Sequence, residues 1–242
     1  LHTTLNGYLE KLLYLITGHF GRQGCNNLHS FLLPLLGHSD ERTVADSRLT
    51  AHHRMFPIAG IYPPNILPDE ILQAGERRIR AVFVDSANPA LTYADTAAYE
   101  AAFRSLDLLV VIDVAMTETA RLADYVLPAA SQFEKWEATG FNLEFPRNAF
   151  HLRHPLFPPL DEALPEPEIY TRLLEALGCL PAHLPALERV AALEPEFTAH
   201  AGYLAALAAT LTLKPRWMPY GASILYRTLG PHLPQGAAAA AP

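Results

Sequence analysis

The sequence predicts an α/β fold, namely a Rossmann-like parallel sheet with flanking helices. Short apolar segments typical of strands stand at residues 79–85, 108–113 and 125–129, and helix-forming segments with polar caps separate them. The segment 108–113 (LLVVID) is apolar almost throughout, as expected for a strand that is covered on both faces. Strands that alternate with helices imply parallel pairing with right-handed crossovers.

An N-terminal helix precedes this region. Residues 6–16 (NGYLEKLLYLI) place apolar side chains at helical spacing, and this spacing predicts a buried amphipathic helix. Gly18 suits the left-handed position that ends such a helix. The Pro- and His-rich residues 31–68 then predict a long irregular connection.

Capping residues define the helices of the α/β region. Pro68 stands in the first turn of one helix, and Asp95 caps the next. Between them, Pro89 excludes a helical conformation at Asn88, which predicts a turn after the first strand. Thr117 is expected to cap a short helix, and Pro128 confines the third strand to an edge or an end of the sheet.

Three segments are expected along the chain. Residues 1–64 form a helix and a Pro-rich connection from a preceding domain, residues 65–178 form the α/β domain, and residues 179–242 form a helical extension with an Ala-rich tail. In the last helix of the α/β domain, Pro167 stands in the first turn and Gly178 follows the end.

Composition restricts the class of protein. Half of the 242 residues are hydrophobic and 18% are charged, which indicates a packed globular protein. The net charge of −7, without a basic run, argues against a nucleic-acid partner, and no apolar segment reaches the ~20 residues of a membrane helix. Cys25 and Cys179 stand far apart and are expected to be free thiols. Because the chain begins with Leu1, we interpret it as a fragment of a longer protein.

Polar residues follow each predicted strand. Asn88 follows the first, Asp113 ends the second, and Glu134 and Lys135 follow the third. In open α/β sheets, ligands bind at the carboxyl ends of the strands. From position alone, Asp113 either caps the following turn or points toward a ligand, and Lys135 either reaches the same ligand or forms a solvated ion pair with Glu134.

Other motifs carry less weight. The spacing of Gly18, Gly21 and Gly24 after a helix differs from the dinucleotide fingerprint, and it indicates a tight turn. The histidine pairs 52–53 and 151/154 have no Cys, Asp or Glu at a familiar metal-ligand spacing, so no metal site is predicted. We also find no nucleophile with a base at recognisable spacing, and no catalytic residue is assigned.

Three longer segments resemble a known family. RIRAVFVDSANPALTYADT, LVVIDVAMTETARLADYVLPAASQFEKWEATGFN and PEPEIYTRLLEALG are similar to the third domain of the molybdopterin oxidoreductases, the family of formate dehydrogenase, periplasmic nitrate reductase and dimethyl sulfoxide reductase. LEKLLYLITGHFGRQGCNN resembles the segment that leaves the second domain of that family. The resemblance covers roughly residues 1–178.

The resemblance implies a bis(molybdopterin guanine dinucleotide) cofactor that carries molybdenum or tungsten. At the position of Asp113 the family has an acid that accepts hydrogen bonds from guanine N1 and N2, and the position of Lys135 contacts ribose or phosphate. Glu166 stands where the family often has an aspartate. The cofactor-binding residues that we expect on this basis are Asn88, Ile112, Asp113, Thr117, Lys135 and Glu166.

The same resemblance implies partners and a reaction. The metal ligand, a [4Fe-4S] cluster and the cap over the cofactor are expected in other parts of the same polypeptide, and an electron-transfer iron–sulfur subunit is a further expected partner. The reaction would be two-electron redox or oxygen-atom transfer. A cytoplasmic location is expected, with the periplasm as the alternative. Two other interpretations are a cofactor-free structural subunit, as in the large subunit of respiratory complex I, and an unrelated NAD or FAD module.

Overall fold

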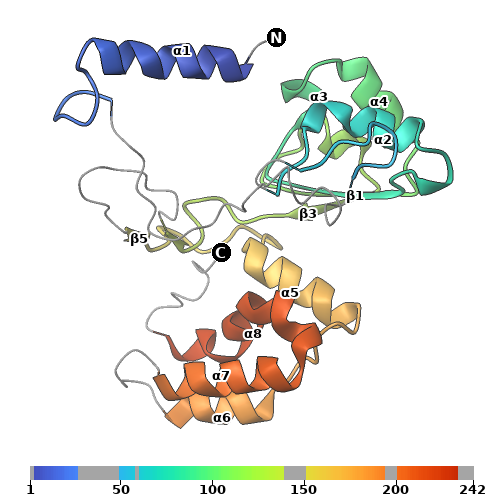
Figure 1. Cartoon of the computed structure of the whole chain (residues 1–242). Helices are drawn as coiled ribbons and strands as arrows, with labels where there is room; N and C mark the ends of the chain where they lie inside the picture. The colour runs from blue at the N-terminus through green and yellow to red at the C-terminus, as the bar shows by residue number, and fades with distance from the viewer. Residues whose placement is uncertain (1–2, 27–48, 58–59, 139–150, 194–200, 234–242) are drawn as a thin grey trace. The chain divides into compact units, whose positions relative to one another are not determined.

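A computed structural model describes residues 3–26, 49–57, 60–138, 151–193 and 201–233 (Figure 1). The chain divides into two compact units. One comprises Leu1–Leu35 with Ala138–His151, and the other comprises Leu36–Glu137 with Leu152–Pro242. None of the helices in the described ranges is long and apolar enough to cross a membrane. The domain boundaries expected from the sequence stay a prediction.

The described part of the first unit is mainly helix α1 (Thr3–Ile16), as predicted. It ends at Gly18, whose φ of 70° is the left-handed value expected of a helix-terminating glycine. Gly21 and Gly24 also have positive φ, which confirms the tight turn. The predicted burial of the helix is wrong for this structure, since Tyr8 is 63% exposed and Leu15 is 57% exposed. The apolar stripe predicts amphipathic helix geometry, whereas burial requires a packing partner.

The second unit contains the predicted parallel sheet. Its strands are β1 (Ala81–Asp85), β2 (Leu108–Asp113) and β3 (Tyr125–Pro128), in the order β1-β2-β3. Both neighbouring pairs are parallel. Strand β3 lies at the edge and Pro128 is its last residue, which confirms the position expected from the proline.

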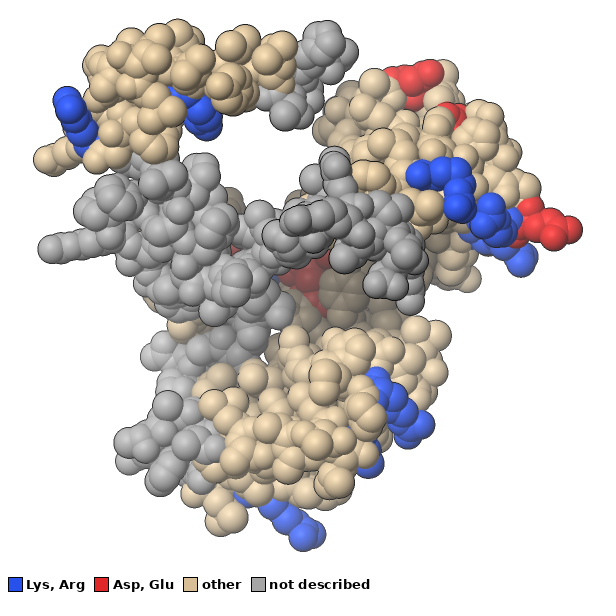
Figure 2. All heavy atoms as spheres, viewed as in Figure 1, with Lys and Arg blue, Asp and Glu red and all other residues tan. Residues whose placement is uncertain are grey.

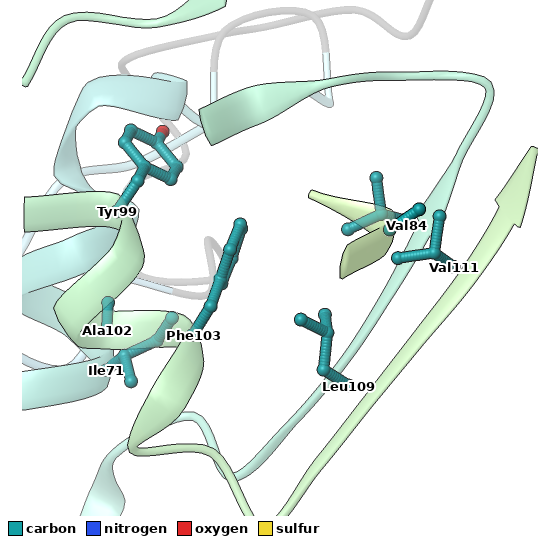
Figure 3. Packing of buried hydrophobic residues seen from close by; sticks show 8 residues of the cluster. Ile71, Val84, Tyr99, Ala102, Phe103, Leu109 and Val111 are labelled. Carbon is teal, nitrogen blue, oxygen red and sulfur yellow. The ribbon is translucent and has the colours of Figure 1, made fainter. Parts of the chain in front are cut away.

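Helices pack against one face of this sheet. They are α2 (Leu67–Leu72), α3 (Pro89–Thr92) and α4 (Thr96–Arg104), with single 3-10 turns at Pro64–Ile66 and Gly75–Arg77. Asp95 caps α4 as predicted, because its Oδ1 accepts a hydrogen bond from the Ala98 amide at 3.0 Å. Figure 3 shows Tyr99 and Phe103 of α4 on the helical side of a core whose strand side includes Leu109 and Val111.

The opposite face of the sheet is covered by α5 (Glu166–Ala176). Ile169 of this helix clusters with Ile112 of β2 and with Ala129. Successive residues of a strand point to opposite faces, so Val111 enters the first core and Ile112 the second. Coverage of both faces explains why β2 is apolar throughout.

The crossover from β2 to β3 differs from the expected short helix. It contains only a single 3-10 turn, Ala120–Leu122, although the Thr117 hydroxyl does accept a hydrogen bond from the Ala120 amide at 3.2 Å. Asp124 then accepts a hydrogen bond from the Leu109 amide at 2.7 Å and so ties the chain back to the sheet. This tie fixes the end of the crossover, and the residues between Asp113 and Asp124 form a loop with one 3-10 turn.

The C-terminal segment is helical, as expected, and it has its own core. It contains α6 (Pro185–Leu193), α7 (Ala201–Leu213) and α8 (Gly221–Thr228), with 3-10 turns at Pro215–Tyr220 and Gly230–His232. Tyr203, Trp217 and Ile224 lie among the buried residues of this core. Arg227 of α8 pairs with Glu175 of α5 at 2.8 Å. The short strands β4 (Glu137–Ala138) and β5 (Leu152–Arg153) pair with each other.

Basic side chains are unevenly distributed over the described surface. On the face in Figure 2, several Lys or Arg side chains lie side by side at the upper right, next to acidic side chains, and the others are isolated. Over the whole sequence the net charge is −7.

Candidate functional site

The carboxyl ends of the three strands lie side by side. Asp85 at the end of β1 is in register with Ile112, and Asp113 at the end of β2 is in register with Pro128. A fourth segment joins this edge, because the Leu164 amide donates to the Pro128 carbonyl at 3.1 Å just before α5 begins. The loops after β1, β2 and β3 and the N-terminus of α5 therefore meet at the edge where parallel sheets present ligands.

Asn88 joins the first two loops. Its Oδ1 accepts hydrogen bonds from the Thr119 amide at 3.1 Å and the Thr119 hydroxyl at 2.8 Å, and its Nδ2 donates to Glu118 Oε2 at 2.7 Å. This last bond is the main reason that the pKa of Glu118 is lowered. Thr119 is fully buried, and its Oγ1 also accepts from the Ala90 amide at 3.1 Å. Asn88 thus fixes the loops to each other: its Oδ1 accepts two hydrogen bonds and one of its two Nδ2 N–H groups is used by Glu118, which leaves the second N–H as the group that could contact a ligand.

Asp113 caps the turn after β2 and keeps an oxygen available. Its Oδ1 accepts a hydrogen bond from the Ala115 amide at 3.1 Å. Its Oδ2 has no hydrogen-bond partner among the residues that the structure describes, and the side chain is half-buried. The two alternatives for Asp113, a cap or a ligand contact, are therefore compatible, since one carboxylate can accept several hydrogen bonds.

Two other expected residues have mainly structural contacts. The side chain of Ile112 is fully buried in the core under α5, and its carbonyl accepts a hydrogen bond from the Ser86 amide at 3.0 Å. The Thr117 hydroxyl caps the 3-10 turn. Any ligand contact by Ile112 would have to be made by its backbone, while the half-buried Thr117 sits in the loop beside Asp113.

Lys135 and Glu166 form a close ion pair at this edge. Lys135 Nζ lies 2.5 Å from Glu166 Oε1 and 2.6 Å from Oε2, and the two side chains are only 13% and 19% exposed. A second carboxylate, Glu137, lies 3.9 Å from the same ammonium. Glu166 neutralises the ammonium, and Glu137 is itself paired with Arg153, so Lys135 attracts a phosphate weakly but still has a third donor for a neutral hydroxyl.

The alternative ion pair between Glu134 and Lys135 is wrong. Glu134 instead accepts hydrogen bonds from the Ser131 amide at 2.8 Å and the Leu160 amide at 3.0 Å. Hydrogen bonds from Ser131 and then from Leu160 lower the pKa of Glu134. Adjacent residues after a strand point in different directions, and Lys135 therefore reaches α5 while Glu134 closes its own loop.

One connection at the end of β1 was not predicted from the sequence. Tyr170 of α5 donates a hydrogen bond to Asp85 Oδ2 at 2.7 Å, and the Ser86 hydroxyl donates to Oδ1 at 2.9 Å. Burial, followed by the hydrogen bond to Asp85, raises the pKa of Tyr170. Ser86 has a φ of 52°, which is a left-handed conformation that non-glycine residues rarely adopt. No local sequence signal links residues 85 positions apart.

A cavity in the same unit lies away from the carboxyl ends of the strands. This cavity of about 440 Å³ lies beside α2, where Tyr62, Pro64 and Ile66 are among its lining residues. Its lining residues do not include the strand ends.

Comparison with known proteins identifies the family. The family model for molybdopterin oxidoreductases matches residues 15–176, which include the sheet, its carboxyl edge and α5. The chain belongs to the molybdopterin oxidoreductase family.

Similar proteins come from archaea and bacteria. The chain is 31% identical over 186 residues to the F420-dependent formate dehydrogenase subunit alpha of Methanocaldococcus jannaschii, covering 69% of this chain and 26% of that protein. It is 33% identical over 139 residues to F420-dependent formate dehydrogenase 1 subunit alpha of Methanococcus maripaludis, covering 51% and 20%. Trimethylamine-N-oxide reductase of Haemophilus influenzae is 29% identical over 128 residues, covering 51% and 15%.

One solved structure is also similar. Acetylene hydratase from Pelobacter acetylenicus matches with a TM-score of 0.45 and 26% identity, over 50% of this chain and 16% of that protein. The chain spans about a quarter or less of the length of these relatives. Family membership agrees with the resemblance found in the sequence, and it does not agree with an unrelated NAD or FAD module.

Proposed function

We propose that this chain holds the guanine nucleotide of a bis(molybdopterin guanine dinucleotide) cofactor in a molybdenum or tungsten oxidoreductase. The observation that carries the proposal is Asp113, a half-buried carboxylate at the end of the central strand with one oxygen unpartnered among the described residues. Guanine presents two adjacent donors, N1–H and N2–H, which a carboxylate can accept together. Asp113 would accept both and so select guanine.

Lys135 would contact the same nucleotide through its ribose. Two of its three donors are directed at Glu166, which neutralises its charge and so weakens its attraction for a phosphate. A ribose hydroxyl carries no charge and can accept the third hydrogen bond. In this proposal Glu166 orients the lysine and does not touch the nucleotide directly.

Asn88 and Thr117 would act by holding the loops around Asp113. The bonds of Asn88 to Thr119 and Glu118 fix the loop after β2 relative to the loop after β1. Thr117 caps the turn that follows Asp113. Ile112 supports the site from the core, because its side chain anchors the end of β2 under α5.

The bound cofactor would supply two-electron redox or oxygen-atom transfer at its metal. The residues described in this chain bind and orient the nucleotide end, while the metal ligand and a [4Fe-4S] cluster would belong to other parts of the polypeptide. We further propose a cytoplasmic location and an iron–sulfur electron-transfer subunit as partner. The relatives include formate dehydrogenases and a trimethylamine-N-oxide reductase, so similarity in this region does not select a substrate.

A cofactor-free structural subunit is the second candidate. The observation that favours it is that Asn88 and Lys135 already have close partners without a ligand. The Asp113 oxygen that has no partner among the described residues favours the first candidate. A half-buried polar atom is usually hydrogen-bonded, and a bound guanine would supply the missing donors.

Metal and nucleotide content of the full-length protein test the proposal. The protein would be purified from cells that make the cofactor, and we expect bound molybdenum or tungsten together with GMP released by acid hydrolysis. A preparation free of both, from cells in which a known enzyme of the family is loaded, would support the structural subunit instead.

Asp113→Asn tests the guanine contact itself. Asparagine keeps an oxygen for the Ala115 amide, but its NH₂ group faces the guanine donors and cannot accept from them. We expect GMP content to fall at least tenfold, since losing a charge-assisted hydrogen bond costs about 1.5–3 kcal/mol. Asp95→Asn is the matched control, because Asp95 also accepts one backbone hydrogen bond but only caps α4. Equal cofactor content in the two variants would refute the role of Asp113.

A further inference from the structure

Two imidazoles and a carboxylate meet on a surface separate from the strand ends. The metal-ligating atoms of His52, His53 and Asp69 all lie within 4.8 Å of one another. No metal site was predicted at His52 and His53, because no third ligand stands near them in the sequence. The fold supplies that ligand from the first turn of α2, 16 residues beyond His53.

The backbone that carries the two imidazoles is fixed by a buried carboxylate. Glu70, the residue after Asp69, is only 3% exposed, and its two oxygens accept hydrogen bonds from the amides of His52 and His53, each at 2.8 Å. Burial by itself would raise the pKa of Glu70, but these hydrogen bonds outweigh it and lower the pKa. The loop therefore stays fastened to α2 when Glu70 is ionised, with both rings beside Asp69.

The side chains are also oriented. Gln73 Nε2 donates to Asp69 Oδ1 at 2.5 Å, which leaves Oδ2 directed at His53 Nε2, 2.8 Å away. The two imidazole rings stand nearly perpendicular, at 87°, with centroids 4.8 Å apart. Among the described residues, the ring of His52 has no hydrogen-bond partner. The hydrogen bond between His53 and Asp69 explains the position of the His53 ring, but it does not explain why the His52 ring lies beside the same two groups.

We propose that His52, His53 and Asp69 bind a zinc ion. Zinc takes nitrogen and oxygen ligands at about 2.0–2.2 Å, so two ligand atoms around a tetrahedral ion lie about 3.3–3.6 Å apart, and atoms separated by up to 4.8 Å would have to approach by about 1 Å. His52 and His53 are exposed and Asp69 is half-buried, which leaves the side chains free to make that adjustment. Two imidazoles disfavour calcium and magnesium, which prefer ligands made of oxygen alone.

Through these ligands, the proposed ion would link the loop at residues 49–57 to the start of α2. Three protein ligands leave a fourth tetrahedral position for water or for a group from the rest of the polypeptide. This site does not depend on the proposed guanine nucleotide site, and its test can fail without affecting that proposal.

Titration of the full-length protein with ZnCl₂ tests the site. Isothermal calorimetry and native mass spectrometry should show one zinc bound per chain beyond metals already present. His52→Ala, His53→Ala and Asp69→Asn should each weaken this binding roughly 100-fold, since even outer-sphere changes commonly cost 10–100-fold. His183→Ala is the matched control, because His183 lies 3.5 Å from a carboxylate, Glu188, without a second imidazole, and it should bind as the wild type does.

Folding is monitored in parallel by circular dichroism. Asp69→Asn is the decisive variant, because asparagine keeps an oxygen for Gln73 and changes only the ligand character. As a second measurement, Co²⁺ in the same site should give the visible absorption bands of a low-symmetry nitrogen and oxygen complex. Absence of saturable zinc binding in the wild type, or binding that all three variants retain, would overturn the proposal.

Discussion

Replacement of Thr119 by valine tests the polar connection that holds the candidate site together. Valine has nearly the same shape as threonine but lacks the hydroxyl, which donates to Asn88 Oδ1 at 2.8 Å and accepts from the Ala90 amide at 3.1 Å. Thr119 is fully buried and Ala90 is 1% exposed, so water cannot replace the lost partner. The substitution therefore leaves a buried N–H group unsatisfied.

The expected cost follows from these contacts. An unsatisfied buried donor costs about 1–3 kcal/mol, and loss of the hydrogen bond to Asn88 adds about 1 kcal/mol. We expect Thr119→Val to lower the free energy of unfolding by about 2–4 kcal/mol. Thr119→Ser keeps both hydrogen bonds and loses one methyl group, at a cost of about 1 kcal/mol.

Thr171→Val is the matched control. Thr171 is 1% exposed, and its hydroxyl donates to the Pro167 carbonyl at 2.7 Å. Its replacement by valine therefore leaves no N–H group without an acceptor. We expect a cost of no more than about 1 kcal/mol. Urea denaturation measures the free energies, and hydrogen exchange of the peptide that contains Ala90 locates the effect. A Thr119→Val variant as stable as Thr171→Val, with unchanged exchange at Ala90, would refute the reasoning.

Two further predictions concern buried carboxylates. Lys135→Met and Glu166→Leu should each cost about 2 kcal/mol of unfolding free energy, while the double variant should cost less than their sum, because each single variant removes the close partner of a mostly buried charge. If Lys135 also contacts the nucleotide, the double variant regains stability but not GMP content; recovery of both would assign the lysine a purely structural role. Glu70 has a lowered pKa, so its contribution to stability is present above the ordinary pKa of a glutamate and is lost as the pH falls through the lowered value. Glu70→Gln should therefore be less stable by about 2 kcal/mol at pH 7, with a difference that shrinks on acidification in urea denaturation; a difference independent of pH would contradict this account.

Local sequence signals were sufficient for most of the regular structure. The apolar run of β2, the cap at Asp95 and the proline at the end of β3 each act within a few residues, and the structure confirms all three. The sequence predicted a helical extension without giving the bounds of α8, and it overestimated the helix after Thr117. In the crossover, the tie between Asp124 and Leu109 prevails over local helix propensity.

The candidate site could likewise be predicted only in part from the sequence. The order of strands and helices was sufficient to predict that polar residues at the strand ends meet at one edge, because parallel strands share one direction. Which of these groups stays available was not predictable, since Asn88 and Lys135 are engaged by residues about 30 positions away. The metal-ligating group of His52, His53 and Asp69 was missed for the same reason.

The sequence by itself determined the fold class, the succession of strands and helices along the chain, and the family. Periodicity, capping and a long motif are properties of neighbouring residues. Only the tertiary structure decided which side chains face each other. Among the described residues, Asp113 keeps an oxygen without a hydrogen-bond partner while Lys135 is paired with Glu166, and the packing of α5 against the end of the sheet brings Glu166 to the lysine. Contacts between distant segments depend on how the elements pack, and no spacing within a segment encodes them.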